Sequence, residues 1–509
     1  MECSSWWQAF TKQIDSTTVL AASILVLASL WIVQLLLGCS EKRRNLIRLA
    51  SKLPGPPTIP LIGNALHFAC RPDETLDKVR ELAKNYDTPL RFWLGPKLFV
   101  VLTEPRDYEV ILGCSKASYK DPVYRFMESF VGQGLVSGSG PVHRQHRKVI
   151  MPMLNSKTLS EYLKYINCHG QKIVRLLEKR VNGGEFDVQP IIARCTFDIM
   201  FDTILGVEAN LKKEDYEDLV YWTETIYELI HTRMMKVWLH PDWIFRWTDT
   251  AKRLEQGKKV IHTFIESAIA QKWKEHKSVD KPSRSILLEQ LIDHVARTDL
   301  MTDEQLRDET YTMFTAAQDT TTVICSFAIL HLAMNQNIQD KVREEMERVV
   351  GTASSIEMEH LNELSYTEMV IKETMRLYPI APLMVRQARG DISLETCTIP
   401  EGCSILMVPF VTHRSAKYWQ QPDDFLPERF APENSSDRHA FAYVPFSAGI
   451  RGCIGQKFAM MLLKTIIGHV VRSYRLTSSK TMDDIRLKMD ISVRSKDGYG
   501  VSIERLRAN

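Results

Sequence analysis

The chain has 509 residues, of which 44% are hydrophobic and 25% are charged, and its formal net charge is +3. These values are ordinary for a globular protein. The small net charge, with no basic stripe interleaved with aromatic residues, argues against a dedicated nucleic-acid binder. No low-complexity run, internal repeat or central linker divides the chain, so we expect one large domain.

The ten cysteines form no Cys-x-x-Cys pair and are scattered through apolar segments. This distribution favours a reducing compartment with free thiols over a disulfide framework. It also provides no zinc-ligand spacing.

The N-terminal region predicts a membrane anchor. Residues 19–38 carry no charge and are long enough to cross a bilayer as a helix. Basic residues follow this segment, whereas acidic residues prevail before it, so we expect residues 1–18 in the lumen and the chain after residue 40 in the cytosol. A buried core helix would not explain this asymmetry. Residues 39–60 form a basic and proline-rich hinge, whose prolines predict a stiff, extended connector.

Residues 61–509 are expected to form the catalytic domain, mainly α with small β-sheets (α+β). Residues 90–101 predict a hairpin with a Gly-Pro turn. Long amphipathic helices are expected at 214–235 and 249–274. Aromatic side chains between them suit either a membrane interface or a helical core: Trp238, Trp243 and Trp247.

A helix of about 33 residues is predicted to begin after Thr302, which forms a capping box with Gln305. Its centre contains an acid and three threonines, including Asp319 and Thr320. Threonines can bond back to the preceding turn, and burying such groups is costly unless they are paired or used. The segment is therefore either a structural kink or part of a functional site.

Two charged segments flank this helix in the sequence. The basic run at 140–148 contains His143 and Arg147, which suit either a solvated helix face or the binding of a carboxylate. Later, Glu373 and Arg376 share one face of a helix that Pro379 ends. The Glu-x-x-Arg pattern recurs elsewhere in the chain and is weak by itself.

Near the C-terminus, Cys453 lies in a glycine-rich turn directly before an amphipathic helix. Glycines allow backbone N–H groups to approach closely, and a helix start adds positive potential. Both features favour a thiolate, which is a soft, anionic metal ligand. The alternative is a buried structural cysteine.

The spacing Phe446-x-x-Gly449-x-Arg451-x-Cys453-x-Gly455 resembles the haem-binding signature of the cytochrome P450 superfamily. The resemblance covers residues 40–509 and is strongest to microsomal members of the animal family-four, fatty-acid ω-hydroxylase clan. It implies one large haem-thiolate domain behind the anchor, in which Cys453 is the axial ligand of haem b, iron protoporphyrin IX.

The resemblance also implies roles for other residues. Asp319 and Thr320 would relay protons during oxygen activation. Contacts to the haem would come from Arg147, His143, Arg386, Arg451 and Phe446. His143 is a departure, because the family usually has Trp there. The structural cluster on the proximal side would be Glu373, Arg376 and Arg429. Ala316 replaces the Glu that forms an ester with haem in many clan members, which predicts non-covalent haem.

The implied activity is a monooxygenase that inserts one oxygen atom of O2 into a lipophilic substrate: a fatty acid, a steroid or terpenoid hormone, or a xenobiotic. The implied electron donor is NADPH through NADPH–cytochrome P450 reductase, with cytochrome b5 as a further candidate partner. We expect a single-pass protein of the endoplasmic reticulum membrane that contacts lipid and no nucleic acid. Two alternatives remain: a haem-thiolate isomerase or dehydratase, and a non-enzymatic haem-binding sensor.

Overall fold

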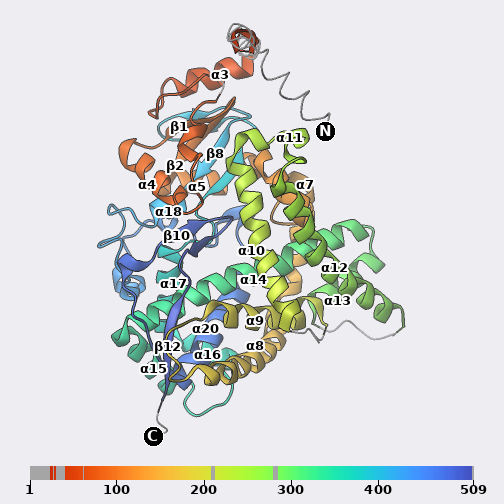
Figure 1. The fold of residues 1–509 in the computed structure, drawn as a ribbon, viewed down its shortest axis with the longest axis vertical. Coiled ribbons are helices and arrows are strands. Elements are labelled where there is room, and N and C mark those ends of the chain that lie inside the picture. The colour runs from red at the N-terminus through yellow and green to blue at the C-terminus, as the bar shows by residue number, and fades with distance from the viewer. Residues whose placement is uncertain are drawn as a thin grey trace, which may run out of the picture.

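The computed structural model describes residues 23–26, 28–29, 41–60, 62–207, 213–278 and 285–506. These residues form a mainly helical molecule with small sheets, which confirms the predicted fold class (Figure 1). The helices longer than one turn are α3 (Glu41–Ala50), α4 (Thr75–Asn85), α5 (Pro105–Gly113), α6 (Arg125–Val131), α7 (Gly140–Ile150), α8 (Ser156–Leu177), α9 (Gln189–Met200), α10 (Lys213–Met235), α12 (Asp249–Ser278), α13 (Leu287–Arg297), α14 (Asp303–Met334), α15 (Gln336–Val349), α16 (Met358–Glu363), α17 (Ser365–Leu377) and α20 (Gln456–Ser473). Three single turns are α11 (Asp242–Phe245), α18 (Pro409–Thr412) and α19 (Pro432–Ser435).

The largest sheet has five strands in the order β1-β2-β8-β5-β3. Its strands are β1 (Leu90–Leu94), β2 (Lys97–Leu102), β3 (Tyr119–Lys120), β5 (Met384–Gln387) and β8 (Ser404–Met407). The predicted hairpin is confirmed, because β1 and β2 pair antiparallel around a turn at Gly95. The smaller sheets consist of β4 (Phe186–Asp187), β12 (Gly500–Arg505) and β9 (Tyr474–Thr477); β6 (Ile392–Ser393) and β7 (Thr398–Ile399); and β10 (Leu487–Met489) and β11 (Val493–Ser495).

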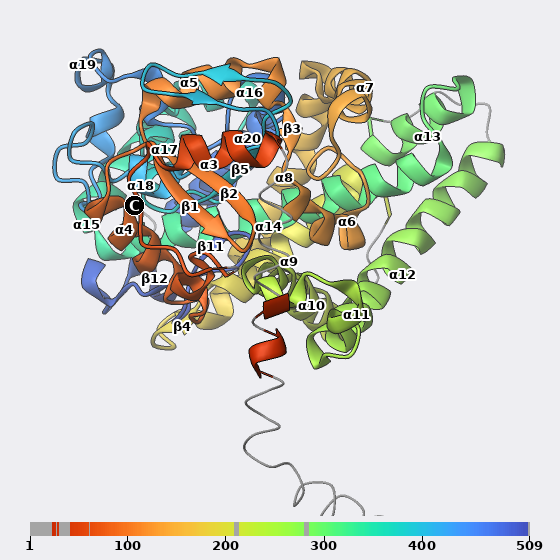
Figure 2. The ribbon, with the colours of Figure 1, turned by 90° about the horizontal axis from the view of Figure 1, so that it is seen from above.

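Side chains alternate across the five-stranded sheet, as a strand requires. On β2, Leu98, Val100 and Leu102 belong to one apolar cluster, whereas Phe99 and Val101 belong to another on the opposite face. Both faces are therefore covered by apolar side chains. Figure 2 shows α3 lying beside this sheet.

The long helix α14 lies at the centre of the fold and packs against α9, α17 and α20 (Figure 1). Its 32 residues match the predicted length, and the capping box between Thr302 and Gln305 is present. Among the described helices, α14 alone is long and apolar enough to cross a membrane, but it is mostly buried inside the protein. Its apolar character is therefore explained by the core.

Most of the predicted membrane anchor and all of residues 1–18 lie outside the described residues. Within the anchor, residues 23–26 and 28–29 are helical. The basic part of the hinge forms α3, and Leu49, Ala50 and Leu53 pack into the apolar cluster beneath the sheet. Part of the hinge thus belongs to the folded domain.

Candidate haem-thiolate site

The loop that carries Cys453 is held by its own backbone. The Cys453 N–H donates to the Phe446 carbonyl at 2.8 Å, and α20 begins three residues later. Gly449 has a φ of +62°, and a Cβ there would lie 2.1 Å from the carbonyl oxygen of Leu112. Only glycine allows this close approach of the loop to the end of α5.

Burial and nearby polar groups have opposite effects on the pKa of the Cys453 thiol. Part of the residue is accessible, yet the thiol lies deep within the protein, and this burial raises its pKa. The N–H of Gly455 and the charge of Arg147 act in the opposite direction. The predicted local effects are present, but burial outweighs them. A cation bound to the sulfur would further stabilise the anion.

A cluster of positive side chains lies near this loop, formed by Lys120, Arg386 and Arg451. Burial and the two arginines lower the pKa of Lys120 well below its usual value. Arg451 donates through Nε to the Ser118 carbonyl at 2.7 Å, while both its terminal nitrogens are buried without a hydrogen-bond partner. Within the described ranges, no carboxylate forms an ion pair with these three residues. Such a cluster is complementary to the two propionates of haem.

Arg147 and His143 on α7 lie beside the same cluster. Arg147 donates to the Gly452 carbonyl at 2.6 Å and so ties α7 to the Cys453 loop. Burial, followed by the neighbouring positive charges, lowers the pKa of His143 to about 3. His143 is therefore neutral and can donate a single hydrogen bond.

Asp319 and Thr320 occupy different faces of α14. Asp319 is buried, forms an ion pair with Arg494 and accepts a 3.1 Å hydrogen bond from the Ser492 hydroxyl. Burial raises its pKa to about 6, although Arg494 opposes this shift. Thr320 is only partly buried and donates back to the Ala316 carbonyl at 2.8 Å, as the sequence predicts. The two side chains are adjacent in sequence but do not hydrogen-bond to each other.

Glu373, Arg376 and Arg429 form one buried cluster. Arg376 donates two hydrogen bonds to the Glu373 carboxylate, at 2.7 and 2.8 Å, and Arg429 donates one at 3.0 Å. Arg376 also donates to the carbonyl of His413, whose ring in turn accepts from the N–H of Val444 at 3.0 Å. The cluster is thereby linked to the segment that leads into the Cys453 loop.

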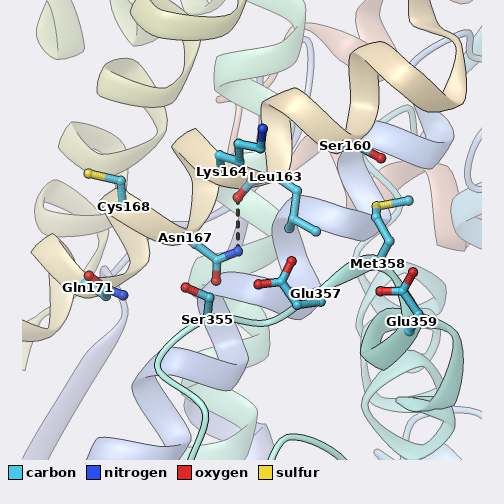
Figure 3. Close-up of a pocket in the computed structure, with 10 residues that line it drawn as sticks. All are labelled: Ser160, Leu163, Lys164, Asn167, Cys168, Gln171, Ser355, Glu357, Met358 and Glu359. Atoms are coloured by element: carbon cyan, nitrogen blue, oxygen red, sulfur yellow. Dashed lines mark hydrogen bonds between the residues drawn. The ribbon is translucent and has the colours of Figure 1, made fainter.

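A polar cavity of about 450 Å³ lies between α8 and the loop before α16 (Figure 3). Its central amide, Asn167, donates to the carbonyls of Leu163 and Ile356 and accepts from the N–H of Ile356. These hydrogen bonds occupy the amide fully, which indicates a role in joining two segments. None of the predicted site residues lines this cavity.

The side chains described above fit haem: one soft ligand on a glycine-rich loop, and basic side chains without a carboxylate partner that suit the two propionates. In the described part of the chain, no group of three or more His, Cys, Asp or Glu side chains is placed to hold a metal ion by itself. These side chains fit a haem-thiolate protein, in which Cys453 would hold the iron of haem.

Comparison with known proteins supports the same class of protein. The sequence profile of the cytochrome P450 family matches residues 53–501. The chain is 31% identical to human cytochrome P450 4V2 over 96% of both chains. It is 32% identical to cytochrome P450 4d1 of Drosophila melanogaster, over 89% of this chain and 92% of that one. It is 28% identical to cytochrome P450 4c3 of the same species over 91% of both. The chain belongs to the cytochrome P450 family and is a haem-dependent monooxygenase, which takes O2, a substrate and electrons from a redox partner.

Several residues of the site were not predicted. Lys120 had no sequence signal, because a lone lysine before Asp121-Pro122 is typical of a turn. Arg494 had no sequence signal either, because it lies in β11 and its partner Asp319 is on α14. Asp490 and Ser492 lie in the turn between β10 and β11, just before Arg494. All three belong to the hydrogen-bonded network around Asp319.

A second unpredicted contact joins α7 to α14. His146 Nδ1 lies 2.6 Å from Glu309 Oε1, and both side chains are fully buried. This contact positions α7, and therefore Arg147, against the central helix.

Proposed function

We propose that this protein is a membrane-anchored cytochrome P450 that hydroxylates a lipophilic substrate with NADPH-derived electrons. Residues 1–18 are proposed to be lumenal, 19–38 to span the endoplasmic reticulum membrane once, 39–60 to form the hinge and 61–509 to form the cytosolic catalytic domain. The observation that carries the proposal is the Cys453 loop beside a cluster of unpaired cations.

Non-covalent haem b is proposed to be held by Cys453 and by polar contacts from Arg147, His143, Arg386 and Arg451. Lys120 would add an amino donor to the same cluster, and a nearby propionate would favour its protonated form. When bound, haem supplies the iron at which O2 is reduced and one oxygen atom is transferred to the substrate. The basic side chains would bind and orient the propionates, and both terminal nitrogens of Arg451 are buried without a hydrogen-bond partner among the described residues. Phe446 contributes through its carbonyl, which fixes the Cys453 backbone.

Protons are proposed to pass through Asp319 and Thr320. With a pKa of about 6, the Asp319 carboxyl can take up and release a proton near neutral pH. Its Oδ1 faces Arg494, whereas the Thr320 hydroxyl lies on the more open face of α14. Delivery therefore requires the Asp319 side chain to turn from Arg494, or a water molecule to bridge the two groups. Arg494 is a positioning residue that holds the Asp319 carboxyl between proton transfers.

The membrane side of the molecule is proposed from exposed apolar residues. Trp238, Trp243 and Trp247 are 46%, 66% and 78% exposed. Ile47 on α3 is 47% exposed, and α3 and α11 lie at the same end of the molecule in Figure 1. Tryptophan is favoured at the interface between membrane and water. We therefore propose that this end rests on the lipid surface next to the anchor.

The partners proposed are NADPH–cytochrome P450 reductase and, as a second electron donor, cytochrome b5. The test is NADPH consumption by purified protein with reductase, combined with product analysis across lipid and xenobiotic panels. Hydroxylated product coupled to NADPH consumption supports the proposal. Conversion of a substrate without NADPH would support the isomerase or dehydratase, and haem binding without turnover of any substrate would support a sensor.

A further inference from the structure

An apolar cavity of about 140 Å³ lies between α10, the five-stranded sheet and the turn that joins β10 to β11. Four of the side chains that line it are methionines, which adapt their shape to irregular ligands. These are Met127, Met234, Met235 and Met489. Pockets that enclose a drug-sized ligand measure roughly 300–1,000 Å³. The cavity therefore suits one end of a slender chain and not a bulky ring system.

One polar side chain in this cavity has no protein partner. His231 on α10 is 5% exposed, and neither ring nitrogen has a hydrogen-bond partner among the described residues. Burial lowers its pKa to about 4, so the imidazole is neutral and offers one donor and one acceptor. Buried polar groups in native proteins are normally paired. The missing partner of His231 is accordingly a group that enters the cavity.

The charged side chains near His231 limit the chemical class of the ligand group that can pair with it. Asp490 lines the same cavity and forms an ion pair with Arg494, at 2.9 Å between Oδ2 and Nε. Arg494 is also paired with Asp319 and with Glu224, so one guanidinium faces three carboxylates. A ligand carboxylate beside His231 would be repelled by Asp490, which lines the same cavity and acts electrostatically on this histidine. A hydroxyl or carbonyl group would not.

We propose that His231 is a substrate-recognition residue and that the substrate is a long apolar molecule with an uncharged hydroxyl or carbonyl group, not an ionised fatty acid. This inference rests on the proposed monooxygenase function and narrows its substrate class. Tyr124 lines the cavity and also contacts Arg386 of the cation cluster. The cavity thus adjoins the haem-binding residues, and the apolar part of the substrate extends from His231 toward them.

The test is equilibrium dialysis of the full-length, haem-loaded protein in detergent with radiolabelled 1-dodecanol and dodecanoate at neutral pH. We expect tighter binding of dodecanol. The His231→Phe variant should bind dodecanol about tenfold more weakly, the effect of one lost hydrogen bond. His231→Gln keeps a donor and an acceptor and should retain most of the affinity. The matched control is His67→Phe, because His67 is exposed and contacts Phe92 from outside the cavity.

Two outcomes would overturn the inference: tighter binding of dodecanoate than of dodecanol by the unmodified protein, or unchanged dodecanol affinity in His231→Phe. If His231→Phe fails to fold, the comparison of dodecanol and dodecanoate binding by the unmodified protein still tests the inference. Asp490→Asn should tighten dodecanoate binding, and no change there would also count against the argument. Because dialysis requires no turnover, its result is separate from the NADPH-coupled assay, whose failure would refute the proposed function instead.

Discussion

Removal of the Arg376 guanidinium is expected to unfold the haem domain. Arg376 is fully buried and donates to Glu373 and to three backbone carbonyls, those of His413, Pro422 and Asp424. Breaking a buried ion pair by removing one partner costs roughly 3–5 kcal/mol. Each carbonyl left without a donor adds about 1 kcal/mol or more. The Arg376→Leu change should therefore lower the free energy of unfolding by more than about 5 kcal/mol, which is close to the whole stability of many domains.

The assay compares the yield of haem-loaded protein and the thermal midpoint of Arg376→Leu with those of the unmodified chain. The matched control is Arg71→Leu, because Arg71 also pairs with a glutamate three residues away, Glu74, but both side chains are largely exposed. An exposed pair contributes little. The control should accumulate normally, whereas Arg376→Leu should yield little protein and no haem spectrum. An abundant Arg376→Leu protein with a normal spectrum would refute the reasoning.

Three further predictions concern the two sides of the site. Burial places the pKa of Asp319 at about 6, above its ordinary 3.8, so its contribution to stability is full below pH 3.8 and is lost as pH rises through 6. Denaturant titrations from pH 4 to 7 should find a flatter dependence in Asp319→Asn; an identical slope would contradict this. Gly449→Ala should abolish haem loading, since its Cβ would clash with the Leu112 carbonyl, whereas Gly402→Ala, also at positive φ but with open space, should load normally. Acid extraction should release all haem, because Ala316 cannot form an ester; haem left on the polypeptide would contradict the non-covalent prediction.

The motifs that are local in sequence could be predicted well. The capping box at Thr302, the length of α14 and the hairpin at residues 90–101 depend on neighbouring residues, and each is present. The i,i+3 spacing of Glu373 and Arg376 also anticipated their contact, because such residues share a helix face.

The features that depend on contacts between distant segments could not be predicted. Arg494 reaches Asp319 across 175 positions of sequence, and no local pattern announces such a pairing. The thiol pKa of Cys453 is a similar case, since glycines and a helix start are visible in the sequence but the degree of burial is not. The orphaned imidazole of His231 appears only once α10 is placed over the sheet.

The measurement that tests the central claim most directly is the reduced carbon monoxide difference spectrum of the purified full-length protein and its Cys453→Ser variant. Thiolate ligation by Cys453 predicts a thiolate-type Soret band in the unmodified protein and its loss in the variant. An unmodified protein without that band, or a variant that retains it, would contradict the assignment of Cys453 as the axial ligand.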